Sequence, residues 1–187
     1  MNKKPIVCGI VAVGPDNVIG RDGRMPWYSK QDFWHFRTIT TPYPCVFGKT
    51  TYEGMSKKTL PNRLNIVCSS QYKNEYVNGV FYANSVESAL NQCVNFDKVF
   101  ICGGGAIYSY VLNRDMIDVM YITKLKDANL TQKIKAEPNE YSRFPMDISE
   151  FFCAPKWSAA QIKYAPNLLP TEQGAITAEF FKCIRVR

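Results

Sequence analysis

One carboxylate stands in a setting that favours acid chemistry. Asp32 lies in the first turn of a helix that the sequence predicts over Ser29–Thr40, directly after a loop containing Met25-Pro26-Trp27. On 3.6-residue spacing its side chain shares a face with Phe33 and Phe36. A carboxyl group beside aromatic rings is partly desolvated, and its proton affinity then becomes tunable. The pattern therefore indicates a candidate for proton transfer.

The same spacing also has a purely structural interpretation. Ser29 followed three residues later by Asp32 fits a capping box, which satisfies free backbone N–H groups at a helix start. A negative charge also suits the positive end of the helix dipole. From spacing alone, capping and catalysis both remain open for Asp32, and its aromatic neighbours favour catalysis.

Three further positions, at predicted strand ends or on the turn before a strand, are suited to binding a ligand. Gly48-Lys49-Thr50-Thr51 places a cation, two hydroxyls and free N–H groups at a helix start, which favours a phosphate. Gly103-Gly104-Gly105 lets the backbone approach a ligand closely. Arg63, on the turn before a predicted strand, could bind a carboxylate through two parallel hydrogen bonds. Each position also has an ordinary alternative. Lys49 could be a solvated surface lysine, the glycine triplet could be a turn that packs a helix against the sheet, and Arg63 could be a solvated arginine.

Composition and charge bound the function. The chain has 187 residues, 46% of them apolar, which predicts a single domain over residues 1–187 with a substantial core. Its net charge of +7, without a long Lys/Arg run, favours a small anionic ligand over nucleic acid or a membrane surface. Seven cysteines, most of them in apolar runs, predict free thiols in a reducing, cytoplasmic location. With His35 as the lone histidine, no metal site is expected.

Apolar runs alternate with helical segments along most of the chain. The run at 6–13 lacks a cleavage site and is too short to span a membrane, so it predicts a buried strand. Residues 126–149 are expected to be polar and irregular, and 151–165 should form an antiparallel hairpin with 176–186. Other strands are expected at 44–47, 64–68, 80–82, 98–102 and 116–125, and other helices at 49–55, at 85–94 and from the glycine triplet to 112.

This alternation predicts an α/β fold. We expect a three-layer sandwich with a mostly parallel central sheet of about eight strands, a C-terminal antiparallel hairpin and helices on both faces. In such a fold, ligands bind at the carboxyl ends of the strands.

In combination and in this order, these segments closely resemble one family, dihydrofolate reductase. The resemblance spans nearly the whole chain, and the Met-Pro-Trp loop, the acid and the later glycine triplet ahead of a tyrosine form a highly specific combination. The matching segments are Val18-Ile19-Gly20, Met25-Pro26-Trp27, Asp32-Phe33 with Phe36, Gly48-Lys49-Thr50-Thr51-Tyr52-Glu53, Leu60-Pro61-Asn62-Arg63, Ser69-Ser70, Gly103-Gly104-Gly105-Ala106-Ile107-Tyr108, Tyr121-Ile122-Thr123 and Phe144-Pro145.

The resemblance implies a site for dihydrofolate. Asp32 would pair with the amino group and ring nitrogen of the pteridine, supported by Thr123, and Arg63 would hold the α-carboxylate of the glutamate tail. Met25 would belong to a mobile loop over the nicotinamide, and Trp27 would lie near the substrate through water. Asp32, Thr123, Met25 and Trp27 make up the implied catalytic set. The other implied substrate-binding residues are Ile10, Val11, Ala12, Phe33, Phe36, Met55, Leu60, Cys102 and Tyr108.

The resemblance also implies NADPH as the cofactor. The glycine triplet looks like the pyrophosphate turn, where the family carries a Gly–Gly cis peptide. Ala106 stands where many relatives have an arginine, so the preference for NADPH over NADH should be narrower. The full implied set is Ala12, Ile19, Gly20, Gly48, Lys49, Thr50, Thr51, Ser69, Ser70, Gln71, Cys102, Gly103, Gly104, Gly105, Ala106, Ile107 and Tyr108.

The implied reaction is hydride transfer to C6 of 7,8-dihydrofolate with protonation at N5, which gives tetrahydrofolate for one-carbon and thymidylate synthesis. Asp32 would act as the acid directly, or would raise the proton affinity of N5 while water delivers the proton. His35 is either a packed helix histidine, which we favour, or a relay. The segment before Phe144-Pro145 is longer than usual and lacks the Gly-Asp pair that steadies the mobile loop in bacterial relatives, which leaves loop dynamics open.

The implied partners are small molecules, namely dihydrofolate and antifolates such as methotrexate or trimethoprim. We expect a cytoplasmic monomer without membrane or nucleic-acid partners. Two alternatives stand beside this interpretation. The fold-related pyrimidine reductase of riboflavin synthesis would need neither Asp32 on this helix nor the Met-Pro-Trp loop, and a structural or RNA-binding module would not need the ligand-binding residues.

Overall fold

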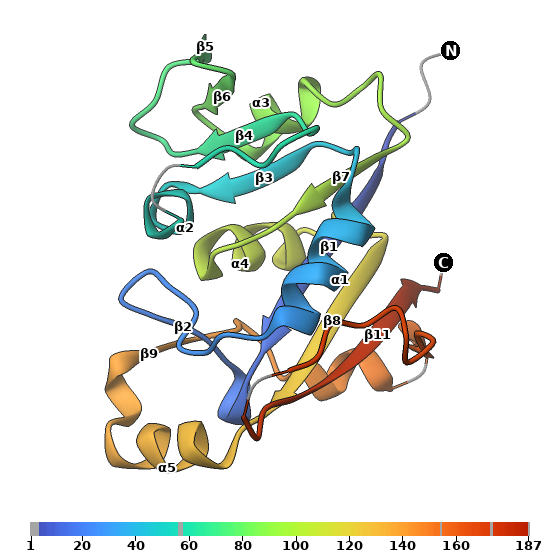
Figure 1. Cartoon of the computed structure of the whole chain (residues 1–187). Helices are drawn as coiled ribbons and strands as arrows, with labels where there is room; N and C mark the ends of the chain where they lie inside the picture. The colour runs from blue at the N-terminus through green and yellow to red at the C-terminus, as the bar shows by residue number, and fades with distance from the viewer. Residues whose placement is uncertain (1–3, 56–57, 154, 173, 187) are drawn as a thin grey trace. The chain divides into compact units, whose positions relative to one another are not determined.

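The computed structural model describes residues 4–55, 58–153, 155–172 and 174–186 (Figure 1). The chain folds into two compact units. The first unit comprises residues 1–9 and 40–118, and the second comprises residues 10–39 and 119–187. The chain passes from one unit to the other within strand β1 (Ile6–Val13), within helix α1 (Lys30–Thr40) and after Asp118.

A parallel sheet forms the centre of the first unit. The first half of β1 pairs with β7 (Lys98–Ile101), and the order continues through β3 (Cys45–Gly48), β4 (Asn65–Cys68) and β6 (Val80–Ala83), all in parallel. The antiparallel neighbour of β6 is β5 (Glu75–Val77). The parallel strands consist of short apolar runs, as expected for strands that are buried on both faces.

Helix α2 (Lys49–Gly54) connects β3 to β4, α3 (Val86–Asn91) connects β6 to β7, and α4 (Gly105–Asn113) follows β7. The Ser85 hydroxyl caps α3 by accepting a hydrogen bond from the Ser88 backbone N–H at 3.1 Å, as the sequence predicts. Helix α2 follows β3 directly, and α4 follows β7 after three residues, so both helices begin near the carboxyl ends of parallel strands. This is where α/β sheets bind ligands.

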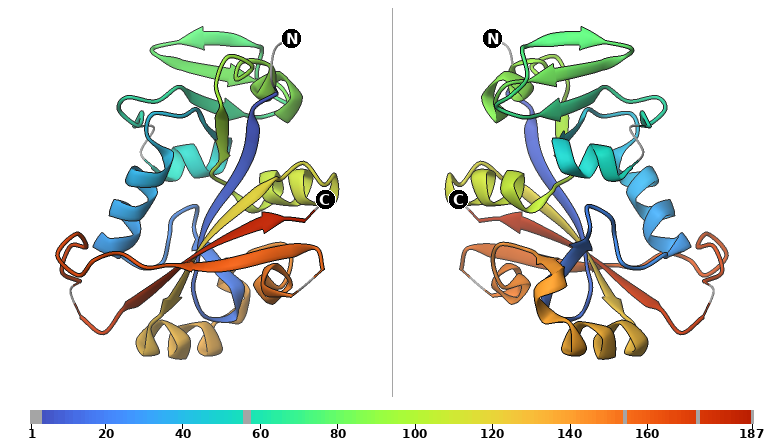
Figure 2. Two further views of the ribbon diagram at one scale, coloured as in Figure 1. Left: turned by 90° about the vertical axis from the view of Figure 1, so that its right-hand side faces the viewer. Right: turned by 90° about the vertical axis from the view of Figure 1, so that its left-hand side faces the viewer.

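The sheet of the second unit is antiparallel. Its strands lie in the order β10 (Trp157–Ile162), β11 (Thr177–Arg185) and β8 (Val119–Lys126), and Figure 2 shows β10 and β11 running side by side. All strands except β2 and β9 belong to one mixed sheet of nine strands. The predicted α/β fold class with its C-terminal antiparallel hairpin is therefore confirmed, with one strand more than the eight expected. The residues at 154 and 173, which fall within the predicted hairpin and its connection, lie outside the described ranges.

The prediction of irregular structure for 126–149 was wrong. Helix α5 (Ala128–Ala136) begins there, because the Asp127 carboxylate caps it by accepting hydrogen bonds from two backbone N–H groups. Strand β9 (Tyr141–Arg143) follows and pairs with β2 (Val18–Arg21), a strand in a stretch that was expected to be loop. Three short 3₁₀ turns complete the elements, at Pro15–Asn17, Pro138–Glu140 and Ile148–Phe152.

Helix α5 and strand β2 contribute to one apolar cluster in the second unit. Its buried members are Val18, Trp27, Leu125, Leu130, Ile134, Tyr141 and Ile176. Leu130 and Ile134 lie four residues apart on α5, so they share the helix face that packs into the cluster. The loop that precedes α1 is therefore anchored at Val18 and at Trp27 by hydrophobic packing.

The seven cysteines are free thiols, as the sequence predicts. Five are buried, whereas Cys102 is partly exposed and Cys153 is exposed. In the described part of the chain, none of the helices has the length and apolarity that a membrane span requires.

We expect the substitution Leu130→Ala to lower the free energy of unfolding by about 2–5 kcal/mol, because it leaves a cavity in the cluster that anchors the loop. Urea denaturation followed by circular dichroism measures this change. Lys133→Ala, an exposed position on the same helix, is the matched control and should change stability by less than ~0.5 kcal/mol. Equal effects of the two substitutions would contradict the packing of α5 described here.

Candidate functional site

The carboxyl group of Asp32 is buried and is not the cap of its helix. The Ser29 hydroxyl accepts the hydrogen bond from the Asp32 backbone N–H at 3.1 Å, so the serine provides the predicted cap. The Asp32 side chain instead accepts a hydrogen bond from the hydroxyl of Thr123 on β8. Both residues are nearly inaccessible, with exposed fractions of 7% and 1%. The second unit thus brings together the two residues that were expected to contact the pteridine.

Burial changes the acidity of Asp32. Desolvation raises its pKa from 3.8 to about 6, because the charged form loses its hydration. The hydrogen bond from Thr123 opposes this shift, and the negative charge of Glu172 adds to it. At pH 7 about a tenth of the Asp32 side chains would carry a proton, far more than for an ordinary aspartate. The group can therefore donate a proton at neutral pH.

The inward face of α1 differs from the predicted one. Asp32, His35 and Thr40 are buried, whereas Phe33 is 43% exposed, with its ring 5.3 Å from that of Tyr28. The expectation that Phe33 and Phe36 both wall the acid was therefore wrong for Phe33, and Phe36 is partly buried. Phe33 thus presents an exposed ring to solvent.

His35 is a packed residue. Its ring stacks on Phe180 at 4.4 Å, and its Nδ1 lies 2.7 Å from the Tyr164 hydroxyl. Burial lowers its pKa to about 4, so His35 is neutral at physiological pH. These contacts support the packing interpretation that we favoured over a relay.

The other expected residues of the second unit lie on β1 and on the loop before α1. Ile10 and Val11 are buried on β1, and Ala12 is partly exposed beside them. Met25 is exposed on the loop. Trp27 is buried, and its indole N–H finds no hydrogen-bond acceptor among the described residues. A buried donor of this kind suits a polar ligand atom or an ordered water.

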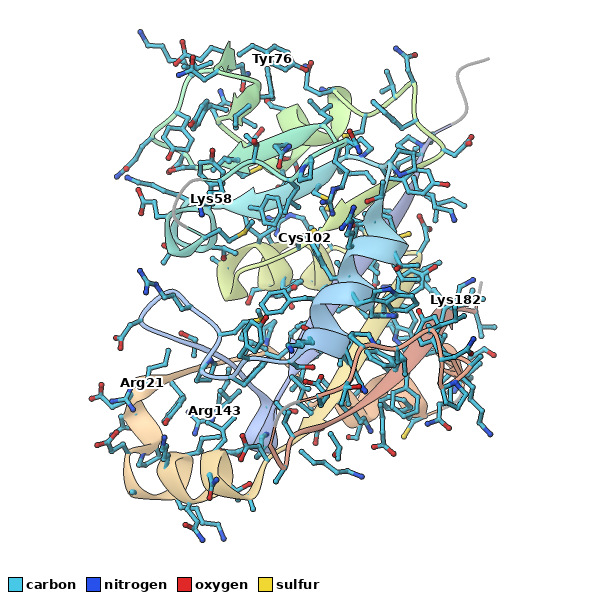
Figure 3. The ribbon with its side chains drawn as sticks, viewed as in Figure 1. Arg21, Lys58, Tyr76, Cys102, Arg143 and Lys182 are labelled. Atoms are coloured by element: carbon cyan, nitrogen blue, oxygen red, sulfur yellow. The ribbon has the colours of Figure 1, made fainter. Side chains whose placement is uncertain are left out.

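The loop before α1 is held by residues of the 126–149 segment, for which irregular structure was predicted. Strand β2, which contains Ile19 and Gly20, pairs with β9. Arg143 of β9 donates to the Asp16 carboxylate at 2.7 Å, and Arg21 of β2 forms a salt bridge with Glu137 at 2.9 Å (both arginines are labelled in Figure 3). These contacts restrain the loop before α1.

In the first unit, the two glycine segments contact one another. The Gly48 N–H donates to the Gly103 carbonyl oxygen at 2.6 Å. A Cβ atom added to Gly104 would lie 2.8 Å from Oγ1 of Thr51, so a side chain cannot be accommodated there without rearrangement. The Gly103–Gly104 peptide is cis, as the resemblance implies, and Gly103 has a φ of +105°. Two strand ends therefore expose backbone groups at one place, where an anionic ligand could approach.

The expected phosphate-binding side chains lie together in the same unit. Lys49 Nζ donates to Oε1 of Gln71 at 2.9 Å, which places the cation beside the residues that follow β4. The Ser69 hydroxyl accepts a hydrogen bond from the Gln71 backbone N–H, and Ser70 is exposed between them. Thr50 is exposed on α2, and Ala106 and Ile107 lie on the first turn of α4.

The remaining expected substrate residues also belong to the first unit. Arg63 donates from Nη1 to the Thr40 hydroxyl at 2.8 Å and from Nε to the Pro61 carbonyl at 3.1 Å, so its guanidinium is oriented. Met55, Leu60 and Cys102 are partly exposed, and the buried Tyr108 packs against Gly103.

Two residues that help to build these sites were missed. Asn65 is buried on β4 and braces the turn that carries Arg63 through bonds to the Leu60 N–H at 2.8 Å and to its carbonyl at 2.9 Å. An asparagine within an apolar strand was a signal that could have been followed. Glu172 was missed because nothing in its local sequence links it to α1.

Comparison with known proteins decides the family. The model of the family described as "Dihydrofolate reductase" matches residues 6–150. The chain belongs to the dihydrofolate reductase family. It is 29% identical over 157 residues to the dihydrofolate reductase of Candida albicans, covering 79% of this chain and 80% of that protein. It is 38% identical over 118 residues to the dihydrofolate reductase of Haemophilus influenzae, and this match covers 63% of this chain and 70% of that protein.

A solved dihydrofolate reductase has the same fold. The structure from Enterococcus faecalis, complexed with NADP(H) and RAB-propyl, covers 97% of each chain with a TM-score of 0.70 and 23% identity. Because the sequences have diverged this far, the match supports the dihydrofolate reductase fold and leaves the roles of single residues to the geometry described above.

We expect Asp32→Asn to stabilise the protein in a pH-dependent way. A raised pKa means that the folded state binds more protons than the unfolded state between about pH 4 and 6, so wild-type stability falls as pH rises through this window. This loss is the contribution of Asp32 alone, which the comparison with the variant isolates, because His35 is present in both proteins. The asparagine side chain of the variant cannot ionise. The free energy of unfolding of the variant, relative to wild type, should therefore grow by about 2–3 kcal/mol from pH 4 to pH 7.5. Urea titrations at several pH values test this, and a constant difference would rule out a perturbed Asp32.

Proposed function

We propose that this chain is an NADPH-dependent dihydrofolate reductase, which converts 7,8-dihydrofolate to tetrahydrofolate. The observation that carries the proposal is the buried Asp32 carboxyl group. It accepts a hydrogen bond from Thr123, and its pKa is raised to about 6. A pteridine presents an amino group and a ring nitrogen, which a carboxylate can bind through two hydrogen bonds. The family of the chain supports the same activity.

The role of Asp32 follows from its surroundings. N5 of the substrate must gain a proton as C6 accepts a hydride. Asp32 holds a proton at a pH where ordinary aspartates have lost theirs, and Thr123 fixes the orientation of the carboxyl group. Asp32 then either donates to the ring or raises the proton affinity of N5 for a proton delivered by water.

The residues of the first unit fit NADPH. Gly103, Gly104 and Gly105 carry no side chains of their own, so a ligand can approach the backbone of this turn closely, which suits a pyrophosphate. Lys49, Ser69, Ser70 and Gln71 offer the donors that a 2′-phosphate needs. Bound NADPH supplies the hydride. Ala12, Ile19 and Gly20 are proposed as further cofactor contacts, and Met25 and Trp27 as members of the loop that excludes water.

The substrate tail is assigned to Arg63. Its guanidinium is oriented by Thr40 and by the Pro61 carbonyl, and a fixed guanidinium matches a carboxylate in two parallel hydrogen bonds. In the second unit, Phe33 and Phe36 are proposed to contact the aminobenzoyl ring. Exposed Phe33 is available for this stacking.

We also propose that the protein acts as a cytoplasmic monomer and binds antifolates such as methotrexate or trimethoprim. The seven free thiols support a reducing compartment. Antifolates present a protonated pteridine or pyrimidine to a carboxylate, which the buried Asp32 would pair with.

The test of the proposed function is Asp32→Asn in single-turnover assays with dihydrofolate and NADPH. The wild-type rate of hydride transfer should fall about tenfold per pH unit above about pH 6, because the protonated fraction of Asp32 falls in that ratio. The variant should lose most of its activity at pH 7 and regain much of it at low pH. Glu150→Gln, an exposed carboxylate, is the control. A variant with the wild-type rate at pH 7 would refute the assignment.

Cofactor choice is tested at Lys49. We expect Lys49→Ala to raise the Michaelis constant for NADPH roughly tenfold and to leave that for NADH nearly unchanged, because one charged hydrogen bond to the 2′-phosphate contributes ~1.5–3 kcal/mol. The difference should shrink as salt increases. Lys58→Ala, an exposed lysine of the same unit, serves as control (Figure 3). Equal weakening of both cofactors would show that Lys49 does not contact the 2′-phosphate.

A further inference from the structure

A glutamate far along the chain binds the start of α1. The Glu172 carboxylate accepts hydrogen bonds from the backbone N–H groups of Lys30, at 3.1 Å, and Gln31, at 2.9 Å. It also accepts a hydrogen bond from the hydroxyl of Ser29. The segment that carries Glu172 is fixed in turn, because the Gln31 side chain donates to the Pro170 carbonyl oxygen at 3.2 Å.

These bonds lead to the backbone of Asp32. Ser29, which is 1% exposed, donates from its hydroxyl to Glu172 and accepts from the Asp32 N–H. The first three N–H groups of the helix that follow Ser29 are therefore satisfied by Glu172 and Ser29 together. The position of Asp32 in the first turn depends on both residues.

The charge of Glu172 matters as well as its hydrogen bonds. A helix start carries a partial positive charge, which favours the ionised form of a nearby carboxyl group. Glu172 offsets this partial charge, and its like charge disfavours a second anion close by. The charge of Glu172 therefore favours the protonated form of the Asp32 carboxyl.

Few titratable or polar groups act on the Asp32 carboxyl. Apart from burial, the contributions come from the Thr123 hydroxyl on β8 and the Glu172 carboxylate on the C-terminal segment. His35, the buried titratable neighbour on α1, is neutral above about pH 4. Among the described residues, Glu172 is therefore the charged side chain whose field acts on the Asp32 carboxyl.

We propose that Glu172 is a positioning residue for the acid Asp32, fixing the first turn of α1 through Ser29 and two backbone N–H groups while its negative charge holds the proton on Asp32. This inference rests on the proposed function of Asp32. It adds to that function a residue from a distant segment that has no place in the family resemblance.

The test compares the pH profile of hydride transfer in wild type and Glu172→Gln, using the full chain with dihydrofolate and NADPH. Glutamine keeps the size of the side chain and removes the charge. The midpoint should move ~0.5 pH unit lower, so that hydride transfer at pH 8 is about threefold slower while the rates at pH 5 differ by only about 1.2-fold. Glu172→Asp restores the charge and should return the midpoint towards wild type. Glu75→Gln, an exposed carboxylate of the first unit, should leave it unchanged.

A purely structural cap gives a different result. In that case Glu172→Gln and Glu172→Ala lower the melting temperature but leave the midpoint at its wild-type pH, and the proposal is overturned. It is also overturned if Glu172→Asp behaves like Glu172→Gln. The ¹³C NMR titration of the Asp32 carboxyl, assigned through Asp32→Asn, needs no turnover. If the wild-type protein does not reduce dihydrofolate, the proposed function is refuted. A lower Asp32 pKa in Glu172→Gln, measured by the NMR titration, would still support the link between the two carboxyl groups.

Discussion

A carboxyl group that is buried yet must still exchange its proton is the constraint on which the second unit depends. Several hydrogen-bond donors would lower the pKa of Asp32 and take its proton away at neutral pH, and the absence of any donor would make ionisation too costly. The fold provides one hydroxyl, from Thr123, and one nearby negative charge, from Glu172. The first N–H groups of the helix that carries Asp32 are satisfied by other residues, so the Asp32 side chain is not needed as a cap.

In the first unit the corresponding constraint is the close approach of two backbone segments, which leaves no space for side chains at the glycines between them. Gly48 and Gly103 are joined by a backbone hydrogen bond, and Gly104 faces Thr51 so closely that a Cβ atom would collide with it. Glycine is required at these positions because a larger side chain would collide with neighbouring residues. Ala106, by contrast, is exposed on α4, so a larger side chain at this position would not disturb the turn.

Sequence reasoning located the features that depend on local patterns. The strand at β1, the helix at α1, the cap at Ser85 and the C-terminal hairpin follow from apolar spacing and capping residues, and all are present. Strand β9 and helix α5 were missed, because their polar sequences gain structure from packing against β2 and the cluster around Leu130. Glu172 is a single charged residue in an irregular segment, and only the folded chain brings it to α1.

The two buried ionisable groups on α1 have opposite effects on proton binding. Asp32 makes the folded state bind one proton more than the unfolded state between about pH 4 and 6, while His35, with its pKa lowered to about 4, makes it bind one proton fewer over almost the same interval. The two contributions nearly cancel. The helix can thus carry two strongly perturbed groups, three residues apart, whose combined contribution to stability changes little between about pH 4 and 6.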